Sequence, residues 1–126
     1  MPLLINYIDF KKAFDSIHRE SLWKIAKTYG IPDKYINIFR SLYRNSSCCV
    51  KTRHGNTIMF DILTGVRQGC ILSPFLFLLV IDYIMKRAVK DRSLGVEWSG
   101  GNRLADLDFA DDIALLSCTH TGLQEM

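Results

Sequence analysis

The spacing of apolar residues along the chain predicts alternating strands and helices. Residues 3–10 form an almost continuous apolar run, which is typical of a buried strand. Residues 18–29 place apolar side chains on one helical face and stop at Gly30, and a second helix opens at Pro32-Asp33. In that second helix, four apolar residues repeat at helical spacing, with basic residues on or near the opposite face: Tyr35, Ile38, Phe39 and Leu42.

The second half of the chain adds more strands and one long helix. The predicted segments are strands at 47–53 and 57–63, a helix from Ser73 to about residue 89, and strands at 94–98, 103–109 and 113–118. We expect Ser73 to be the N-cap of the long helix, because Pro74 suits a first helical position. This order of elements predicts an α+β fold, in which helices pack on one face of a sheet.

Composition narrows the class of protein without identifying it. The 126 residues predict one domain over residues 1–126, and 48% hydrophobic with 23% charged residues is typical of a globular protein. A net charge of +3 is too small to indicate nucleic-acid binding by itself. The apolar stretch 74–81 is too short to span a membrane, so no membrane partner is expected. Four cysteines without metal-ligand spacing indicate reduced thiols in an intracellular protein.

The first candidate chemistry lies in three acidic residues. Asp111 and Asp112 are adjacent and have apolar flanks on both sides, which predicts the tip of a tight β-hairpin. Two like charges held together disfavour each other's ionisation, and a divalent cation such as Mg²⁺ relieves that repulsion. Asp9 ends the first predicted strand. One carboxylate from a strand and a pair from a turn are what a two-metal phosphoryl-transfer site requires.

Two further blocks have structural explanations when each is taken alone. Asp9 or Asp15 could cap the helix that follows, and Phe14 could be a core aromatic residue. The glycines of the loop at residues 65–72 could serve a turn. The functional alternative is that Gly69 lets backbone approach a nucleotide, while Arg67 and the following helix N-terminus supply positive potential.

Together, however, the three blocks resemble the palm of the reverse transcriptases encoded by non-LTR (LINE-type) retrotransposons and group II introns. The family motifs occur in order: Ile8-Asp9-Phe10-Lys11-Lys12-Ala13-Phe14-Asp15, then Arg67-Gln68-Gly69-Cys70-Ile71-Leu72-Ser73-Pro74, then Phe109-Ala110-Asp111-Asp112. Phe109 replaces the tyrosine usual at its place, which keeps an aromatic ring and loses a hydroxyl. The resemblance covers practically the whole chain and implies a palm-type antiparallel sheet without fingers and thumb.

The resemblance also implies a role for each matching residue. Asp9 and Asp111 would be the principal ligands of two Mg²⁺ ions, for which Mn²⁺ could substitute. The Phe10 backbone carbonyl would assist them, and Asp112 would complete the acidic cluster in a lesser role. Phe14 would be a steric gate that selects deoxynucleotides.

A second set of residues would form the pocket for the incoming nucleotide and the template base. These residues are Arg67, Gln68 and Gly69 in the loop before the long helix. The implied partners are an RNA template, a DNA primer and deoxynucleoside triphosphates. Fingers, thumb and an endonuclease region would belong to a larger polyprotein, the isolated segment would have little activity, and the implied location is the nucleus.

Two other hypotheses stay open from the sequence. One is a palm relic that binds nucleic acid without catalysis. The other is a different palm-type polymerase or a diguanylate-cyclase-like enzyme, which would share the acids but not the block from Arg67 to Pro74.

Overall fold

The computed structural model describes residues 2–126, with Arg92 described by its backbone alone. The chain forms two compact units. The first unit contains the residues up to Ala13 together with Val80–Met126, and the second contains Phe14–Leu79. The boundary falls within helix α3 (Ser73–Ala88). Helices and antiparallel strands coexist, so the predicted α+β class is confirmed; the assignment of one domain stays a prediction.

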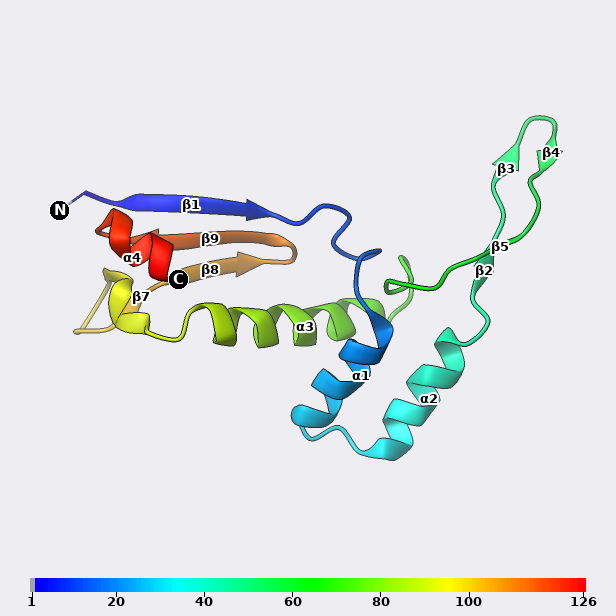
Figure 1. Cartoon of the computed structure of the whole chain (residues 1–126), viewed down its shortest axis with the longest axis horizontal. Helices are drawn as coiled ribbons and strands as arrows, with labels where there is room; N and C mark the ends of the chain where they lie inside the picture. The colour runs from blue at the N-terminus through cyan, green and yellow to red at the C-terminus, as the bar shows by residue number, and fades with distance from the viewer. Residues whose placement is uncertain (1) are drawn as a thin grey trace. The chain divides into compact units, whose positions relative to one another are not determined.

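The first unit is built on an antiparallel sheet of three strands in the order β1-β9-β8 (Figure 1). The strands are β1 (Leu4–Asp9), β8 (Asp106–Phe109) and β9 (Asp112–Ser117). Strand β9 is central, and its side chains Ile113 and Leu115 are buried. The expectation of a buried first strand is wrong: Tyr7 is 78% exposed, because β1 lies at the edge of this sheet.

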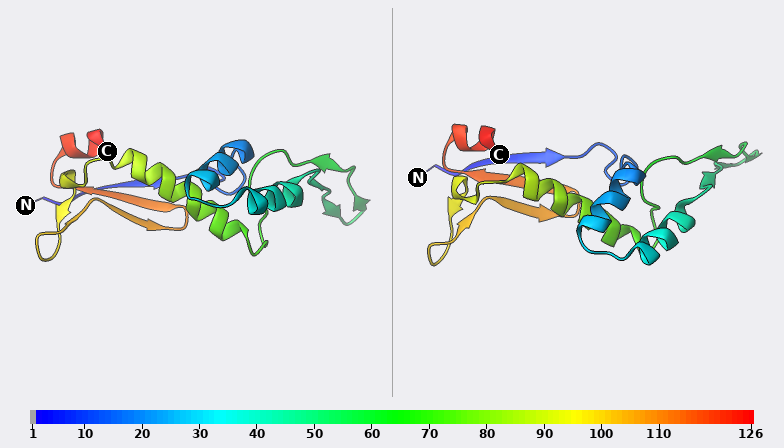
Figure 2. Two further views of the ribbon diagram at one scale, coloured as in Figure 1. Left: turned by 90° about the horizontal axis from the view of Figure 1, so that it is seen from below. Right: turned by 60° about the horizontal axis from the view of Figure 1, so that its bottom comes forward.

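Shorter elements complete this unit. In the second half of α3, Ile81 and Met85 are buried one helical turn apart, and Val89 continues the stripe just beyond the helix. That half of the helix runs beside the sheet (Figure 2). The remaining elements are the short 3₁₀ helix η1 (Arg92–Leu94), the hairpin β6 (Val96–Glu97) with β7 (Arg103–Leu104), and α4 (His120–Glu125).

The second unit begins with two helices, α1 (Arg19–Thr28) and α2 (Asp33–Tyr43). Their shared core contains Leu22, Trp23 and Tyr43, and the Trp23 and Tyr43 rings meet edge to face at 5.8 Å. Helix α2 is apolar on two faces. It buries Ile36 and Tyr43, whereas three residues of its regular apolar repeat are exposed: Tyr35, Ile38 and Leu42.

A two-stranded ribbon follows, as the sequence predicts, but its ladders are short. Strand β2 (Ser47–Cys48) pairs with β5 (Phe60–Asp61), and β3 (Lys51–Thr52) pairs with β4 (Gly55–Asn56). The strands predicted at 47–53 and 57–63 would leave His54, Gly55 and Asn56 as the turn, but Gly55 and Asn56 belong to β4, so the turn consists of Arg53 and His54. Between the two ladders the Thr57 hydroxyl accepts the Val50 N–H, and a side chain therefore takes the place of a ladder acceptor.

Helix α3 begins where expected, although Ser73 is not its cap. The Leu72 carbonyl accepts the Leu76 N–H at 3.0 Å, so Leu72 precedes the helix and Ser73 is its first residue. The Ser73 hydroxyl instead donates to the Arg67 carbonyl. Within the described residues, no helix is both long enough and apolar enough to cross a membrane.

Candidate functional site

The predicted acids meet at one end of the three-stranded sheet. Asp9 is the last residue of β1 and lies directly opposite Asp112, the first residue of β9. Phe109 ends β8 and is the partner of Asp112 on its other side. Directly opposed residues of an antiparallel sheet share a face, so all three side chains project from the same face. The pairing of Asp9 with Asp112 joins the first and third sequence blocks.

Asp111 lies in the turn beside this row. The closing pair of the hairpin is Phe109 with Asp112, which leaves Ala110 and Asp111 as a two-residue turn. Ala110 has φ +56°, the left-handed backbone that the favoured two-residue hairpin turns require. The predicted hairpin tip is therefore confirmed, with Asp111 in the turn and Asp112 in the strand.

The charges of these acids are unbalanced within the protein. Asp9 and Asp112 are exposed and Asp111 is half-buried. Directly opposed residues have Cβ atoms about 4.5–5.5 Å apart, and like charges at that separation destabilise a sheet. The ion pairs found among residues 2–126 involve none of the three acids. A cation from outside the chain would relieve this repulsion.

The acids suit Mg²⁺ in chemistry but do not form a closed cage. Carboxylate oxygens are the hard ligands that Mg²⁺ prefers. In the part of the chain that the structure describes, no three His, Cys, Asp or Glu side chains are arranged to hold one ion. The geometry therefore offers the opposed pair Asp9 and Asp112, with Asp111 in the adjoining turn.

Apolar side chains border the acids on the same sheet face. Tyr7, Leu107 and Ala114 occupy opposed positions two residues along their strands from Asp9, Phe109 and Asp112. With Asp9 and Asp112 they line an open cavity, which Asp111 does not line, and Tyr7 and Phe109 are among the most exposed aromatic residues of the chain. This face is open to a large ligand.

The second sequence block is tied to the first in the other unit. The Val66 N–H donates to the Phe14 carbonyl and the Gly65 N–H to the Ile17 carbonyl, both at 2.8 Å. The Thr64 hydroxyl donates to the Asp15 carbonyl at 2.9 Å. Gly65 has φ +80°, and a Cβ there would lie 2.7 Å from both the Asp15 Cα and the Phe14 carbonyl oxygen. Only glycine permits this close approach.

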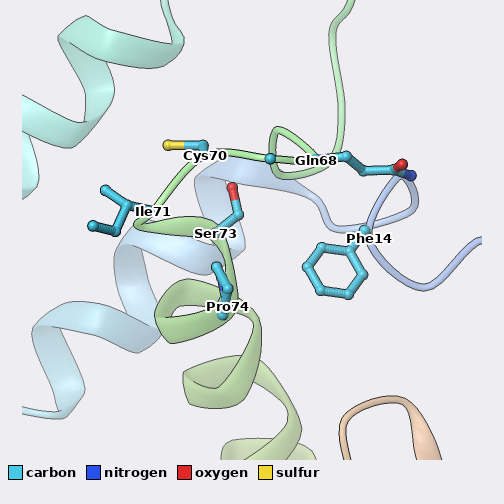
Figure 3. Close-up of a pocket in the computed structure, with 7 residues that line it drawn as sticks. Phe14, Gln68, Cys70, Ile71, Ser73 and Pro74 are labelled. Atoms are coloured by element: carbon cyan, nitrogen blue, oxygen red, sulfur yellow. The ribbon is translucent and has the colours of Figure 1, made fainter.

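The result is a pocket lined by Phe14, Gln68 and Gly69, in which the Phe14 ring lies near the Gln68 side chain (Figure 3). The Phe14 ring stacks on Phe77 with centroids 4.4 Å apart and planes within 8°, so its position is fixed. The cavity measures about 740 Å³, within the usual range for a small-molecule site. The other lining residues are Cys70, Ile71, Ser73 and Pro74.

Arg67 is held by its neighbours in the second unit. Its guanidinium donates to the Ser46 hydroxyl at 2.9 Å and lies 5.6 Å from the centre of the Tyr43 ring. Tyr43 in turn shares a hydrogen bond with Ser73 through its hydroxyl, at 3.1 Å. These contacts fix the start of the loop that carries Gln68 and Gly69. The substrate-binding role expected of Arg67 stays a prediction.

Arg19 is the residue that sequence reasoning missed. Its guanidinium donates to the carbonyls of Gly65, Tyr43 and Thr64 at 3.0, 3.1 and 3.2 Å, and lies 5.0 Å from the Tyr43 ring centre. Burial lowers the pKa of this guanidinium, the Tyr43 phenol raises it, and the nearby Arg67 charge lowers it. A cation in the first turn of a helix is unfavourable, because it faces the positive end of the helix dipole. The unusual position of Arg19 at the start of α1 was therefore the one feature of the sequence that could have drawn attention to it.

Asp15 does not cap helix α1. That position belongs to His18, whose Nδ1 accepts the Ser21 N–H at 3.3 Å. Asp15 contributes its backbone carbonyl, which accepts the Thr64 hydroxyl.

Comparison with known proteins identifies the family to which the chain belongs. The family model "Reverse transcriptase (RNA-dependent DNA polymerase)" matches residues 3–126. The chain belongs to the reverse transcriptase family. The resemblance stated from the three sequence blocks is therefore confirmed.

Two relatives are polyproteins of retrotransposable elements. The chain is 34% identical over 122 residues to a Pol polyprotein of retrotransposable element R2 from Nasonia vitripennis, covering 97% of this chain and 12% of that protein. It is 31% identical over 121 residues to the R2DM polyprotein of Drosophila melanogaster, covering 95% of this chain and 11% of that protein. The chain thus spans only about a tenth of these relatives.

One solved structure shows the same fold. Apo telomerase from Candida tropicalis, truncated from its C-terminal domain, superposes with a TM-score of 0.73 at 21% sequence identity. The match covers 99% of this chain and 26% of the telomerase chain.

Proposed function

We propose that this chain is the catalytic palm segment of an RNA-directed DNA polymerase that carries out nucleotidyl transfer with two Mg²⁺ ions. The observation that carries the proposal is the opposition of Asp9 and Asp112 across β1 and β9, with Asp111 in the adjoining turn. The sheet β1-β9-β8 would be the palm sheet, with helices packed on one face. The membership of the family supports the reaction class.

The proposed roles follow the sequence blocks. Asp9 and Asp111 would hold the ions, assisted by the Phe10 carbonyl and with Asp112 in the lesser role; Mn²⁺ could substitute. When bound, such ions activate the primer 3′-hydroxyl and stabilise the leaving pyrophosphate. The protein contributes positioning and electrostatics, since phosphoryl transfer needs no covalent intermediate. Strand pairing fixes Asp9 and Asp112, and the tight turn fixes the backbone of Asp111.

In the second unit, Gln68 and Gly69 would line the pocket for the nucleotide, with Arg67 as a further contact. Phe14 would be the gate against a ribose 2′-hydroxyl, because Phe77 fixes its ring. The partners would be an RNA template, a DNA primer and deoxynucleoside triphosphates. Fingers, thumb and an endonuclease region would come from the rest of a polyprotein acting in the nucleus, and the segment alone would have little activity.

A second candidate function is a palm relic that binds nucleic acid without catalysis. The observation in its favour is that the described residues contain no three-ligand metal arrangement. Divalent metal binding separates the two candidates, because a relic with displaced carboxylates would gain nothing from Mg²⁺.

Mg²⁺ should raise the melting temperature of the 126-residue chain. Thermal melting, monitored by circular dichroism, should show that the free energy of unfolding rises by about 1.4 kcal/mol when free Mg²⁺ is tenfold above its dissociation constant. In Asp112→Asn the Mg²⁺ effect should shrink. Without metal, that variant should melt slightly higher than wild type, because the opposed negative charges are gone, a gain of about 0.2–1 kcal/mol.

Asp106→Asn is the matched control. Asp106 lies in the same sheet, three residues before Phe109, and therefore projects from the opposite face. Its substitution should leave the Mg²⁺ response intact. An equal response in wild type and Asp112→Asn would count against a metal site at these acids.

Phe14→Val should weaken discrimination against ribonucleotides. A smaller side chain leaves room for a 2′-hydroxyl, and the loss of such a contact changes selectivity by roughly 10–200-fold. The measurement is primer extension with deoxynucleotides against ribonucleotides, using the Nasonia vitripennis R2 polyprotein with its matching segment replaced by this chain. Phe75→Val is the control, since Phe75 is an exposed aromatic residue outside the pocket lining. Unchanged sugar selectivity in Phe14→Val would show that Phe14 only packs against Phe77.

A further inference from the structure

The net positive charge of the chain is concentrated in one segment. Residues 44–72 contain four basic residues, Arg44, Lys51, Arg53 and Arg67, and one acidic residue, Asp61. The whole chain has 16 Lys and Arg residues against 13 Asp and Glu residues. The remainder of the chain is therefore balanced, and the +3 excess of the whole chain resides in residues 44–72, where Arg44 and Arg67 flank the ribbon that carries Lys51, Arg53 and Asp61. The segment includes the ribbon formed by β2, β3, β4 and β5, here called the basic ribbon (residues 47–61).

The basic ribbon ends in the turn between β3 and β4 (Figure 1), and hydrogen bonds hold this tip in a defined shape. Lys51 pairs with Asn56, and Thr52 with Gly55. The Thr52 hydroxyl donates to the Gly55 carbonyl at 2.6 Å and accepts the His54 N–H at 3.3 Å. Gly55 has φ +123°, which only glycine adopts without strain. Arg53 therefore extends from an ordered turn, and Lys51 extends from the strand that leads into it.

The side chains at the tip are unneutralised. Lys51, Arg53 and His54 are exposed, and among residues 2–126 no ion pair involves Lys51 or Arg53. Between Arg44 and Arg67 the one carboxylate is that of Asp61, at the base of the ribbon. The tip therefore presents positive charge to an anionic partner.

The rest of the basic ribbon is unusually apolar for an exposed ribbon. Val50, Ile58, Met59 and Phe60 are all exposed, and Ile58 is 89% exposed. A two-stranded ribbon is marginally stable in water by itself. Exposed apolar side chains next to unpaired cations are typical of a surface that binds a ligand with both anionic and apolar parts.

We propose that the basic ribbon binds single-stranded RNA, with Lys51 and Arg53 on phosphates and Phe60 against a base. Single strands offer phosphates and unstacked bases together, and proteins bind them with cations and aromatic stacking surfaces. A duplex hides its bases and would leave the apolar side chains uncovered. The inference rests on the proposed function, in which such a strand is the template.

The test is fluorescence anisotropy of the 126-residue chain with a labelled RNA of about 20 nucleotides. Neither divalent metal nor nucleotide is added. Lys51→Gln/Arg53→Gln should reduce the slope of log affinity against log salt by about 1.4, or roughly 25-fold in affinity at 0.1 M salt. Phe60→Ser should cost about tenfold and leave that slope unchanged.

Lys24→Gln/Lys34→Gln is the control of equal net charge. Both lysines are exposed on the helices of the second unit, outside the basic ribbon. This control should lose little affinity, and circular dichroism should show all variants folded. Equal losses in the two double variants would overturn the proposal, because net charge alone would then explain binding. Absence of RNA binding by wild type at low salt would also overturn it.

A blunt RNA–DNA hybrid of the same length tests whether the basic ribbon prefers a single strand to a duplex. It should bind more weakly than the single strand and respond little to Phe60→Ser. Equal affinity and an equal Phe60 effect would overturn the assignment to single strands. Since the assay requires neither metal nor nucleotide, a chain that fails in primer extension can still pass here, and the reverse holds as well.

Discussion

Asp111→Ala should abolish primer extension in an R2 polyprotein that carries this chain in place of its matching segment. Asp111 occupies the turn beside the opposed pair Asp9 and Asp112, where the metal-bound phosphates would develop charge. If Asp111 is a principal metal ligand, as proposed above, its loss should remove several kcal/mol of transition-state stabilisation. A loss of about 4 kcal/mol corresponds to roughly 10³-fold in rate. The measurement is the length and amount of DNA copied from an RNA template.

Asp106→Ala should retain extension, since Asp106 belongs to β8 but projects from the opposite face. The comparison separates the loss of a metal ligand from a general change in the charge of the sheet. Extension by Asp111→Ala at the wild-type rate would remove Asp111 from the reaction and would favour the relic.

Gly65→Ala should strongly destabilise the second unit, because it combines backbone strain with overpacking. Alanine is strained at φ +80°, which costs about 1–2 kcal/mol. Its Cβ would also lie 2.7 Å from the backbone at Phe14 and Asp15, and overpacking of that kind costs about 1–3 kcal/mol more. We expect a total of about 3 kcal/mol and a melting temperature lower by roughly 10 °C.

Gly30→Ala is the matched control for this experiment. Gly30 has the same φ of +80°, but a Cβ there would meet nothing within 4 Å. It should show the strain alone, about 1 kcal/mol. If both variants lost the same stability, the contact between Gly65 and the Phe14 segment would carry no energetic weight.

Local pattern predicted most of the elements correctly. The apolar run before Asp9 forms a strand, and the acids with apolar flanks form a hairpin tip. Both results follow from backbone preferences and side-chain periodicity, which act over a few residues. The position of Gly30 after helix α1 is equally local, since a positive φ at that point favours glycine.

Tertiary packing decided what the sequence left open. The regular repeat in α2 predicts one apolar face, but the helix buries Ile36 and Tyr43, because Trp23 and two arginines gather around the Tyr43 ring. The periodicity of apolar residues shows which side chains share a helical face, but it does not show which residues pack against that face in the folded chain. Edge position explains the exposed Tyr7 in the same way, since strand order is a long-range property.

The candidate site was predicted in part for the same reason. Motif spacing selected Asp9, Asp111 and Asp112 without giving the register that sets Asp9 against Asp112. The role of Arg19 could not be predicted, although a cation in the first turn of a helix is unusual, because its acceptors are carbonyl oxygens, which every residue possesses. Only the folded chain shows which carbonyls converge on one guanidinium.

The order of the strands has a consequence for how the protein folds. Strand β1 pairs with a strand far along the sequence, since Asp9 and Asp112 are 103 positions apart. Contacts of such high contact order form slowly, because the chain loses entropy before it gains their energy. During synthesis, the first strand must wait for its central partner with its backbone groups unpaired, a state prone to aggregation. The nascent protein should therefore depend most on chaperones before β9 has left the ribosome.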